Sequence, residues 1–129
     1  DVSNLTKLTG FYASNNKLTS LDLSKNIALN YLSCDNNEFR SINLKNGKNT
    51  LLSTNSIFLR NNPNFTCLAV DDVEYAKTNW TYIDKNVVIY PFECGTITTL
   101  DVAFEQKLID LGIDTDGLNG KISIASRIF

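Results

Sequence analysis

Residues 8–26 read LTGFYASNNKLTSLDLSKN, and residues 29–47, which lie 21 positions further along, read LNYLSCDNNEFRSINLKNG. When the two stretches are aligned, the recurring apolar positions coincide and Asn16 meets Asn37. The same register extends backwards, because residues 1–3 fall on residues 22–24. The match predicts an internal repeat of 21 residues, and such repeats indicate an architecture built from stacked units.

Each period contains apolar residues at alternate positions, first Phe11 and Ala13 and then Leu32 and Cys34. This alternation places their side chains on one face of a short strand. The asparagine that follows is expected inside the turn, where its amide would bond backbone groups. The pattern recurs at half-period over residues 18–26, which leaves little room for a helix. We therefore expect a mainly β fold, a short-repeat (21-residue) leucine-rich-repeat solenoid.

The domain organisation follows from where the pattern fails. It stops after Leu44, residues 46–56 form an irregular turn, and it resumes near Phe65 and Cys67, which we align with Leu32 and Cys34 by an offset of 33 residues. Residues 1–70 are therefore expected to form the solenoid. Residues 71–95 are expected to form an aromatic-rich C-terminal cap. Residues 96–129 are expected to hold a linker and a helical segment.

One short α-helix is expected near the C-terminus. Phe104, Leu108 and Leu111 recur at helical spacing over residues 101–112, and Gly112 is a helix stop. The Asp-, Asn- and Gly-rich residues 114–120 partly match a calcium loop, but their spacing is off by one residue and no glutamate provides the bidentate ligand. A turn is the better interpretation, and no metal site is predicted.

The composition argues against several functional classes. The chain carries 12 Lys and Arg against 14 Asp and Glu, so it lacks the basic footprint of a nucleic-acid-binding protein. No apolar run reaches the length of a transmembrane helix, and no membrane insertion is expected. Histidine, the commonest general base and metal ligand, is absent. Since no nucleophile, phosphate-binding or metalloprotease motif occurs, we expect neither an enzyme nor a cofactor.

Several phrases are specific enough to compare with a known family. They are LDLSKN at 21–26, NNPNFTC at 61–67, VDDVEY at 70–75 and NWT at 79–81. Together with the repeat they resemble secreted leucine-rich-repeat proteins of marine and gut Bacteroidetes, and residues 104–117 resemble the cap that opens a further repeat array there. The resemblance implies an exported protein, secreted or at the cell surface, that binds proteins or glycans. Because the chain starts inside the pattern, we expect it to be part of a longer protein.

The three cysteines are widely separated and include no CxxC pair, so a zinc site is not expected. Cys34 occupies an inward position equivalent to Ala13 and is interpreted as a small buried hydrophobe. Cys67 ends the array and Cys94 closes the cap. In an exported protein, as the resemblance implies, a Cys67–Cys94 disulfide would fasten the cap and contribute about 3–4 kcal/mol in the chain-entropy model. In a reducing compartment both would be core residues.

Candidate ligand-binding residues occupy the outward strand positions, which form columns across successive turns. Aromatic rings beside hydroxyls and a carboxylate suit protein contacts and also stacking on sugar rings. Aromatic residues are favoured on sheet surfaces in any case, so a purely structural cover is the alternative. The predicted set is Tyr12, Ser14, Tyr31, Ser33, Asp35, Asn64 and Thr66.

These observations predict a non-catalytic recognition module of an exported bacterial protein, which binds a protein or polysaccharide through the outward strand surface of the repeats. The alternative is a structural spacer or cap that presents neighbouring domains of a larger surface protein. An open repeat end at Asp1 would leave strand edges unpaired, so self-association through exposed repeat ends is a further expectation.

Overall fold

The computed structural model describes residues 1–98 and 121–123. The chain divides into two compact units, Asp1–Pro91 and Phe92–Phe129. In the second unit, β8 (Thr96–Thr98) pairs with β9 (Lys121–Ser123) in an antiparallel manner. The helix predicted over 101–112 and the turn predicted over 114–120 lie outside the described residues. All the predicted ligand-binding residues lie in the first unit.

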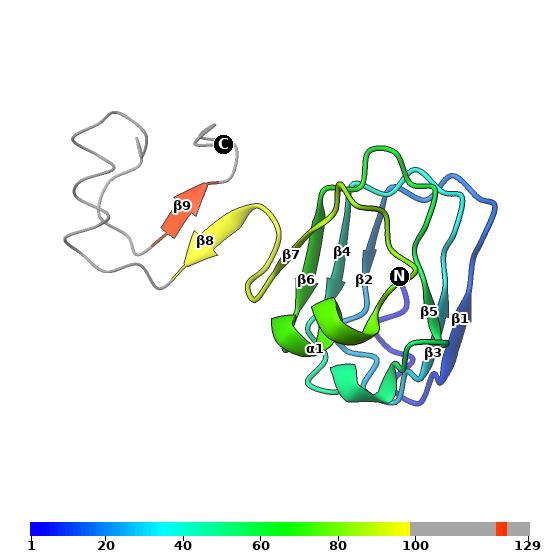
Figure 1. The fold of residues 1–129 in the computed structure, drawn as a ribbon. Helices are drawn as coiled ribbons and strands as arrows, with labels where there is room; N and C mark the ends of the chain where they lie inside the picture. Colours follow the sequence, from blue (N-terminus) through cyan, green and yellow to red (C-terminus); the bar gives the residue numbers. More distant parts are fainter. Residues whose placement is uncertain (99–120, 124–129) are drawn as a thin grey trace, which may run out of the picture. The chain divides into compact units, whose positions relative to one another are not determined.

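Two parallel sheets build the first unit (Figure 1). The three-stranded sheet has the order β1-β3-β5 and contains β1 (Gly10–Tyr12), β3 (Tyr31–Ser33) and β5 (Ile57–Phe58). The four-stranded sheet has the order β2-β4-β6-β7 and contains β2 (Ser20–Asp22), β4 (Ser41–Leu44), β6 (Cys67–Val70) and β7 (Val88–Tyr90). The helical elements are η1 (Asn49–Leu51) and α1 (Val73–Asn79). The chain passes alternately through the two sheets from β1 to β6.

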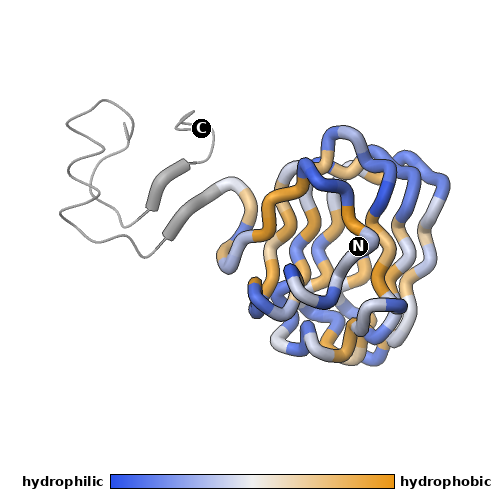
Figure 2. The backbone as a smooth tube through the Cα atoms, viewed as in Figure 1, coloured by the Kyte–Doolittle hydropathy of each residue, from blue (hydrophilic) through white to orange (hydrophobic). Residues whose placement is uncertain are grey.

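One apolar core belongs to both sheets. Leu32 of β3, Ile42 of β4 and Leu68 of β6 are all fully buried in it. Hydrophobic residues recur at matching places along neighbouring strands, as Figure 2 shows. Burying each such side chain contributes about 1.5–3 kcal/mol relative to leaving it in water. Because side chains alternate along a strand, the residues between the buried ones form the outer faces of the two sheets.

The fold class expected from the sequence is wrong. In place of a mainly β solenoid whose single helix lies near the C-terminus, the described residues form an α/β-like arrangement of two small parallel sheets and the helix α1. The helix lies within residues 71–95, where no helix is predicted. It begins after Asp72, whose carboxylate accepts a hydrogen bond from the Tyr75 N–H at 2.9 Å as an N-cap. Ala76 and Trp80 anchor it on the core.

Strand spacing explains part of this error. Gly10 pairs with Tyr31, and Ser20 pairs with Ser41, a difference of 21 residue numbers in both cases. The next pairings depart from that period. Ser41 pairs with Cys67, a difference of 26, because η1 and its flanking turns lengthen the connection between β4 and β6.

The alignment of Cys67 with Cys34 at an offset of 33 is therefore wrong. Leu32 pairs with Ile57, a difference of 25, and the Cys34 N–H donates to the carbonyl of Phe58. Cys67 belongs to the four-stranded sheet and alternates with Leu68, which faces the core. Cys67 thus lies on the outer side of β6, not in the inward column that holds Cys34.

Asparagine side chains satisfy the backbone groups at the turns that follow the three-stranded sheet. Asn37 and Asn62 are buried, and each follows an asparagine in the left-handed conformation, Asn36 at φ 59° and Asn61 at φ 58°. Asparagine tolerates this conformation better than most residues. The Asn62 Oδ1 accepts the N–H of Asn37 at 3.0 Å. Its Nδ2 donates to the carbonyls of Cys34, Leu59 and Arg60. The role predicted for the asparagine after each strand is confirmed for Asn37, whose Nδ2 donates to the Ala13 carbonyl of the neighbouring turn at 2.8 Å. It is not confirmed for the equivalent Asn16, which is exposed and bonds its own turn.

We expect Asn62→Ala to destabilise the protein far more than Asn16→Ala, the equivalent change in the turn after β1. Removing the Asn62 amide leaves buried donors and acceptors unpaired at about 1–3 kcal/mol each, so we expect a loss of about 3 kcal/mol or more. Asn16 is exposed and its Nδ2 bonds only the carbonyls of Ala13 and Ser14. Its removal should cost less than about 1 kcal/mol. Urea unfolding followed by circular dichroism measures both, and equal losses would contradict the role of Asn62.

Candidate functional site

A row of stacked aromatic rings crosses the outer face of the three-stranded sheet. This aromatic row consists of Tyr12, Tyr31, Phe58 and Tyr82. Successive ring centroids are separated by 4.8, 5.9 and 5.0 Å, and the interplanar angles are 23°, 45° and 25°. Tyr82 joins the row because its carbonyl accepts a hydrogen bond from the Leu59 N–H at 2.8 Å. Aromatic pairs of this kind contribute about 0.5–1.5 kcal/mol beyond the area they bury.

Gly10 provides the space in which the Tyr12 ring lies. In the sheet, Gly10 is directly opposite Tyr31. A Cβ atom on Gly10 would come within 2.8 Å of the Tyr12 Cε2, which is closer than carbon atoms pack. The missing side chain therefore lets the Tyr12 ring lie over Gly10 and reach Tyr31. Tyr12 itself stays 74% exposed, so the first ring of the row is open to solvent.

Stacking determines which parts of the rings a ligand meets. In a stacked pair the two ring faces are turned toward each other, so neighbouring rings of the row cover much of each other's faces. No hydrogen bond within the described part of the chain engages the hydroxyl groups of Tyr12, Tyr31 or Tyr82. The row therefore offers ring edges and phenolic hydroxyls more than open ring faces.

Polar side chains form a belt beside the aromatic row. The hydroxyl groups of Ser14 and Ser33 are hydrogen-bonded at 2.8 Å. The Asp35 carboxylate accepts from the Arg60 guanidinium at 3.1 Å and from the Arg60 backbone N–H at 2.6 Å. The Arg60 guanidinium also lies 4.9 Å from the centre of the Tyr82 ring, a cation–π contact. Arg60 is thus held between a carboxylate and a ring, and the belt carries little net charge.

The structure brings most of the predicted ligand-binding residues together on this face. They are Tyr12, Ser14, Tyr31, Ser33 and Asp35. Asn64 and Thr66 do not belong to it, since they follow the turn that leaves the three-stranded sheet. The Thr66 carbonyl accepts a hydrogen bond from the Val88 N–H at 3.0 Å, which attaches this residue to the four-stranded sheet. Their inclusion depended on the incorrect 33-residue offset.

The sequence analysis missed Phe58, Arg60 and Tyr82. For Phe58 and Arg60 a signal exists, because the dipeptide Asn61-Asn62 repeats Asn36-Asn37 at the correct offset of 25. Alignment on this dipeptide, not on the cysteines, places Phe58 beside Ser33 in the sheet. Tyr82 has no such signal, because no Asn-Asn pair follows it.

The cysteines fall into two kinds. The predicted disulfide between Cys67 and Cys94 is confirmed. In the chain-entropy model a loop of this length contributes about 3–4 kcal/mol. Such bonds persist in oxidising compartments, so the disulfide fits an extracellular protein. Cys34 is free and buried, and burial, followed by the charge of Asp35, raises the pKa of its thiol to about 12. It therefore stays protonated, as a packing residue does.

Residues 1–98 and 121–123 contain no cluster of three or more metal-ligating side chains. Hydrogen bonds from the side chain and backbone of Ser24 lower the pKa of the Asp22 carboxyl, which keeps it ionised and away from general-acid chemistry. None of the helices described in residues 1–98 is long and apolar enough to cross a membrane.

Comparisons with protein-family models, with curated proteins and with solved structures find no match to this chain. The function is therefore inferred from the geometry of the aromatic row and of the polar belt.

We expect the Cys34 thiol to resist alkylation by iodoacetamide at pH 8 in the folded protein and to react when urea unfolds the chain. Its pKa of about 12 lies well above the ordinary value of 9.0, so very little thiolate is present at pH 8. Because the folded-state pKa is the higher one, the related stability is complete below about pH 9 and is lost as the pH rises towards 12. The change with pH in the difference in unfolding free energy between the protein and Cys34→Ala measures this contribution. Rapid labelling of the thiol in the folded protein at pH 8 would contradict the prediction.

Proposed function

We propose that this chain is a non-catalytic recognition module and that its ligand-binding surface is the outer face of the three-stranded sheet. The observation that supports the proposal is the aromatic row, whose rings are ordered by mutual stacking before any ligand arrives. Immobilising a free side chain on binding costs about 0.5–1.5 kcal/mol, and a pre-ordered row avoids much of that cost. Tyrosine combines a large apolar area with a hydroxyl group, and it is enriched at protein interfaces.

A protein ligand suits this surface better than a polysaccharide. Stacking on a sugar needs an open ring face, whereas the rings of the row are turned toward one another. Ring edges and hydroxyl groups can instead contact apolar side chains and backbone carbonyls of a protein. A polysaccharide is the second candidate, and the observation in its favour is Tyr12, a residue that is 74% exposed at one end of the row.

We also propose that the protein acts outside the cell or at its surface, as an exported bacterial protein. The Cys67–Cys94 disulfide supports this localisation, because cytosolic thiols are kept reduced.

A structural spacer that presents neighbouring domains is the alternative function. It is favoured by the way in which groups on the face satisfy one another. Ser14 bonds Ser33, Asp35 pairs with Arg60, and Arg60 covers the Tyr82 ring. A face of this kind needs no ligand to be stable.

The test is binding to immobilised panels of secreted proteins and of polysaccharides, with variants of the row measured in parallel. We expect Tyr31→Ala, which removes the ring between Tyr12 and Phe58, to weaken binding about tenfold or more, as interface tyrosines do. Gly10→Ala displaces the Tyr12 ring, because the added Cβ would lie 2.8 Å from it, but removes no ring from the row. This variant should therefore weaken binding less than Tyr31→Ala does. Ser20→Ala is the matched control, because this exposed residue starts a strand of the other sheet.

Melting curves establish that each variant is folded. Saturable binding that persists in folded Tyr31→Ala protein would locate the ligand elsewhere and refute the proposed surface. If neither panel shows binding, the spacer function is favoured instead. Binding to proteins but not polysaccharides, or the reverse, identifies the ligand class.

A further inference from the structure

Two phenol rings of the aromatic row are in direct contact. Tyr12 of β1 stacks on Tyr31 of β3, with ring centroids 4.8 Å apart and an interplanar angle of 23°. Further along the row, Tyr82 stacks on Phe58 in nearly the same geometry, at 5.0 Å and 25°. The two pairs differ in chemistry, because only the first consists of two phenols. The row therefore contains one pair of phenols in contact and a second pair, of similar geometry, in which one phenol is missing.

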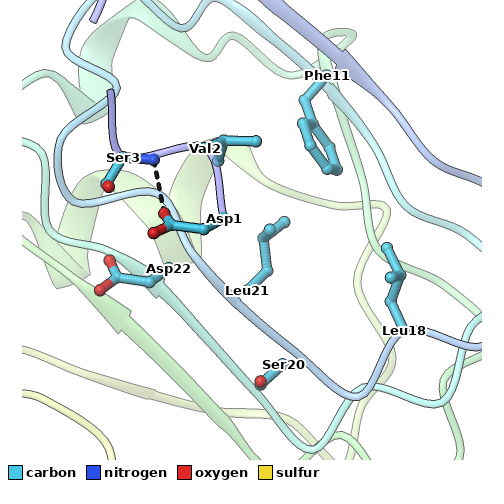
Figure 3. A pocket seen from close by; sticks show the side chains of 8 residues that line it. All are labelled: Asp1, Val2, Ser3, Phe11, Leu18, Ser20, Leu21 and Asp22. Atoms are coloured by element: carbon cyan, nitrogen blue, oxygen red, sulfur yellow. Dashed lines mark hydrogen bonds between the residues drawn. The ribbon is translucent and has the colours of Figure 1, made fainter. Parts of the chain in front are cut away.

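Strand alternation holds both phenols on the outer face of the three-stranded sheet. Figure 3 shows Phe11 beside Leu18 and Leu21, around a pocket on the inner side of β1. Since successive side chains of a strand point to opposite faces, Tyr12 points outward. Tyr31 does so for the same reason, because the next residue, Leu32, is fully buried in the core. Both rings thus lie where an oxidant in the solvent reaches them.

We propose that Tyr12 and Tyr31 form a site of oxidative modification, at which the two rings couple to dityrosine. The oxidant is hydrogen peroxide, activated by a haem peroxidase, which takes one electron and one proton from each phenol. The two phenoxyl radicals form a carbon–carbon bond between ring positions ortho to the oxygens, and each ortho hydrogen then moves to the phenol oxygen. One molecule of peroxide is reduced to two molecules of water, so the oxidation and the reduction balance.

Contact between the rings directs the coupling to this pair. Two radicals that are held together react without a diffusional encounter, and this proximity favours them over phenols that are far apart. The terminal torsion of a tyrosine side chain has a broad distribution, so the rings can turn until their ortho carbons meet. The strands that carry the rings are already in register, with Gly10 opposite Tyr31. The coupling therefore needs a rotation of side chains and leaves the pairing of β1 with β3 intact.

The cross-link would stabilise the first turns of the fold. It closes a covalent loop between positions 12 and 31, which restricts the unfolded chain as a disulfide does. The urea midpoint of the cross-linked protein is therefore expected to lie above that of the unmodified protein. The Cys67–Cys94 disulfide fits the oxidising kind of compartment in which such a reaction takes place. The modification does not rest on the proposed function, because it needs no ligand on the outer face.

The test is to treat the full chain with a haem peroxidase and hydrogen peroxide and to map the product by mass spectrometry. Trypsin cleaves after lysine and arginine, so each of the five tyrosines falls in a different peptide. We expect a monomeric product in which residues 8–17 are linked to residues 26–40. Its mass should be lower than the sum of the two peptides by two hydrogen atoms. This linkage should exceed every other pairing of tyrosines and should carry the fluorescence of dityrosine.

Three variants separate the geometry of the rings from their chemistry. Tyr31→Phe keeps a ring in the row but removes one phenol, and should abolish the cross-link. Phe58→Tyr adds a phenol beside Tyr82 at the 5.0 Å spacing, and should create a second cross-link, between residues 49–60 and 78–85. Tyr82→Phe is the matched control, because it removes the remaining phenol of the row and should leave the first cross-link unchanged.

Several results would overturn the inference. They are the absence of dityrosine from the oxidised protein, a linkage of residues 8–17 to 26–40 that is no more frequent than other tyrosine pairings, and cross-links that only join two molecules. If Phe58→Tyr gave no second cross-link, stacking would not direct the coupling, and the inference would be refuted as well. None of these results bears on ligand binding by the outer face, which is measured separately through Tyr31→Ala.

Discussion

Backbone groups at the turns between the sheets are shielded from water, and buried asparagine amides satisfy them. Asn62 connects its own turn to the preceding one. Beside the four-stranded sheet, Asn49 connects its turn to the following one, since its Oδ1 accepts the Asp71 N–H at 2.7 Å and its Nδ2 donates to the Leu44 carbonyl at 2.7 Å. Each amide bonds turns that are far apart in sequence, so it fixes the separation of the strands. The Asn26 Nδ2 likewise donates to the carbonyls of Val2 and Leu5, although within the described part of the chain its buried Oδ1 has no hydrogen-bond partner.

The aromatic row is a consequence of this strand separation. When strands lie side by side in register, rings on their outer positions come within stacking distance without further adjustment. What the sequence adds is the choice of residues: tyrosine or phenylalanine at successive places, and glycine at position 10, where a side chain would push the Tyr12 ring away. The same regularity makes the outer face of the three-stranded sheet stable without a ligand, and it also orders the rings before a ligand binds. For this reason the recognition and spacer functions both agree with the geometry and differ only in whether binding occurs.

The sequence predicted local features well and the fold class poorly. The alternation of apolar residues, the register of β1 with β3, the role of Asn37 and the Cys67–Cys94 disulfide all follow from patterns within one period or from the cysteine positions. The helix α1 and the longer spacings after β3 do not. They depend on contacts that the repeat does not contain, such as the Asp72 N-cap and the anchoring of Trp80 on the core, where the indole N–H donates to the Leu52 carbonyl at 2.8 Å.

The sequence allows the aromatic row to be predicted as far as Phe58, because an Asn-Asn pair marks each turn up to Asn61-Asn62. Beyond Tyr82 the turn position is taken by Asp84, whose carboxylate accepts the N–H groups of Asn61 at 3.1 Å and Asn62 at 2.9 Å. A carboxylate accepts hydrogen bonds but, unlike an amide, donates none. Asp84 therefore accepts from the turn before it, as Asn62 does, but it donates nothing back to the carbonyls of that turn, whereas Asn62 donates to the Cys34 carbonyl. The Arg60 guanidinium covers the Tyr82 ring. The two ends of the row therefore differ, because Arg60 covers the ring of Tyr82 whereas Tyr12 is exposed to solvent.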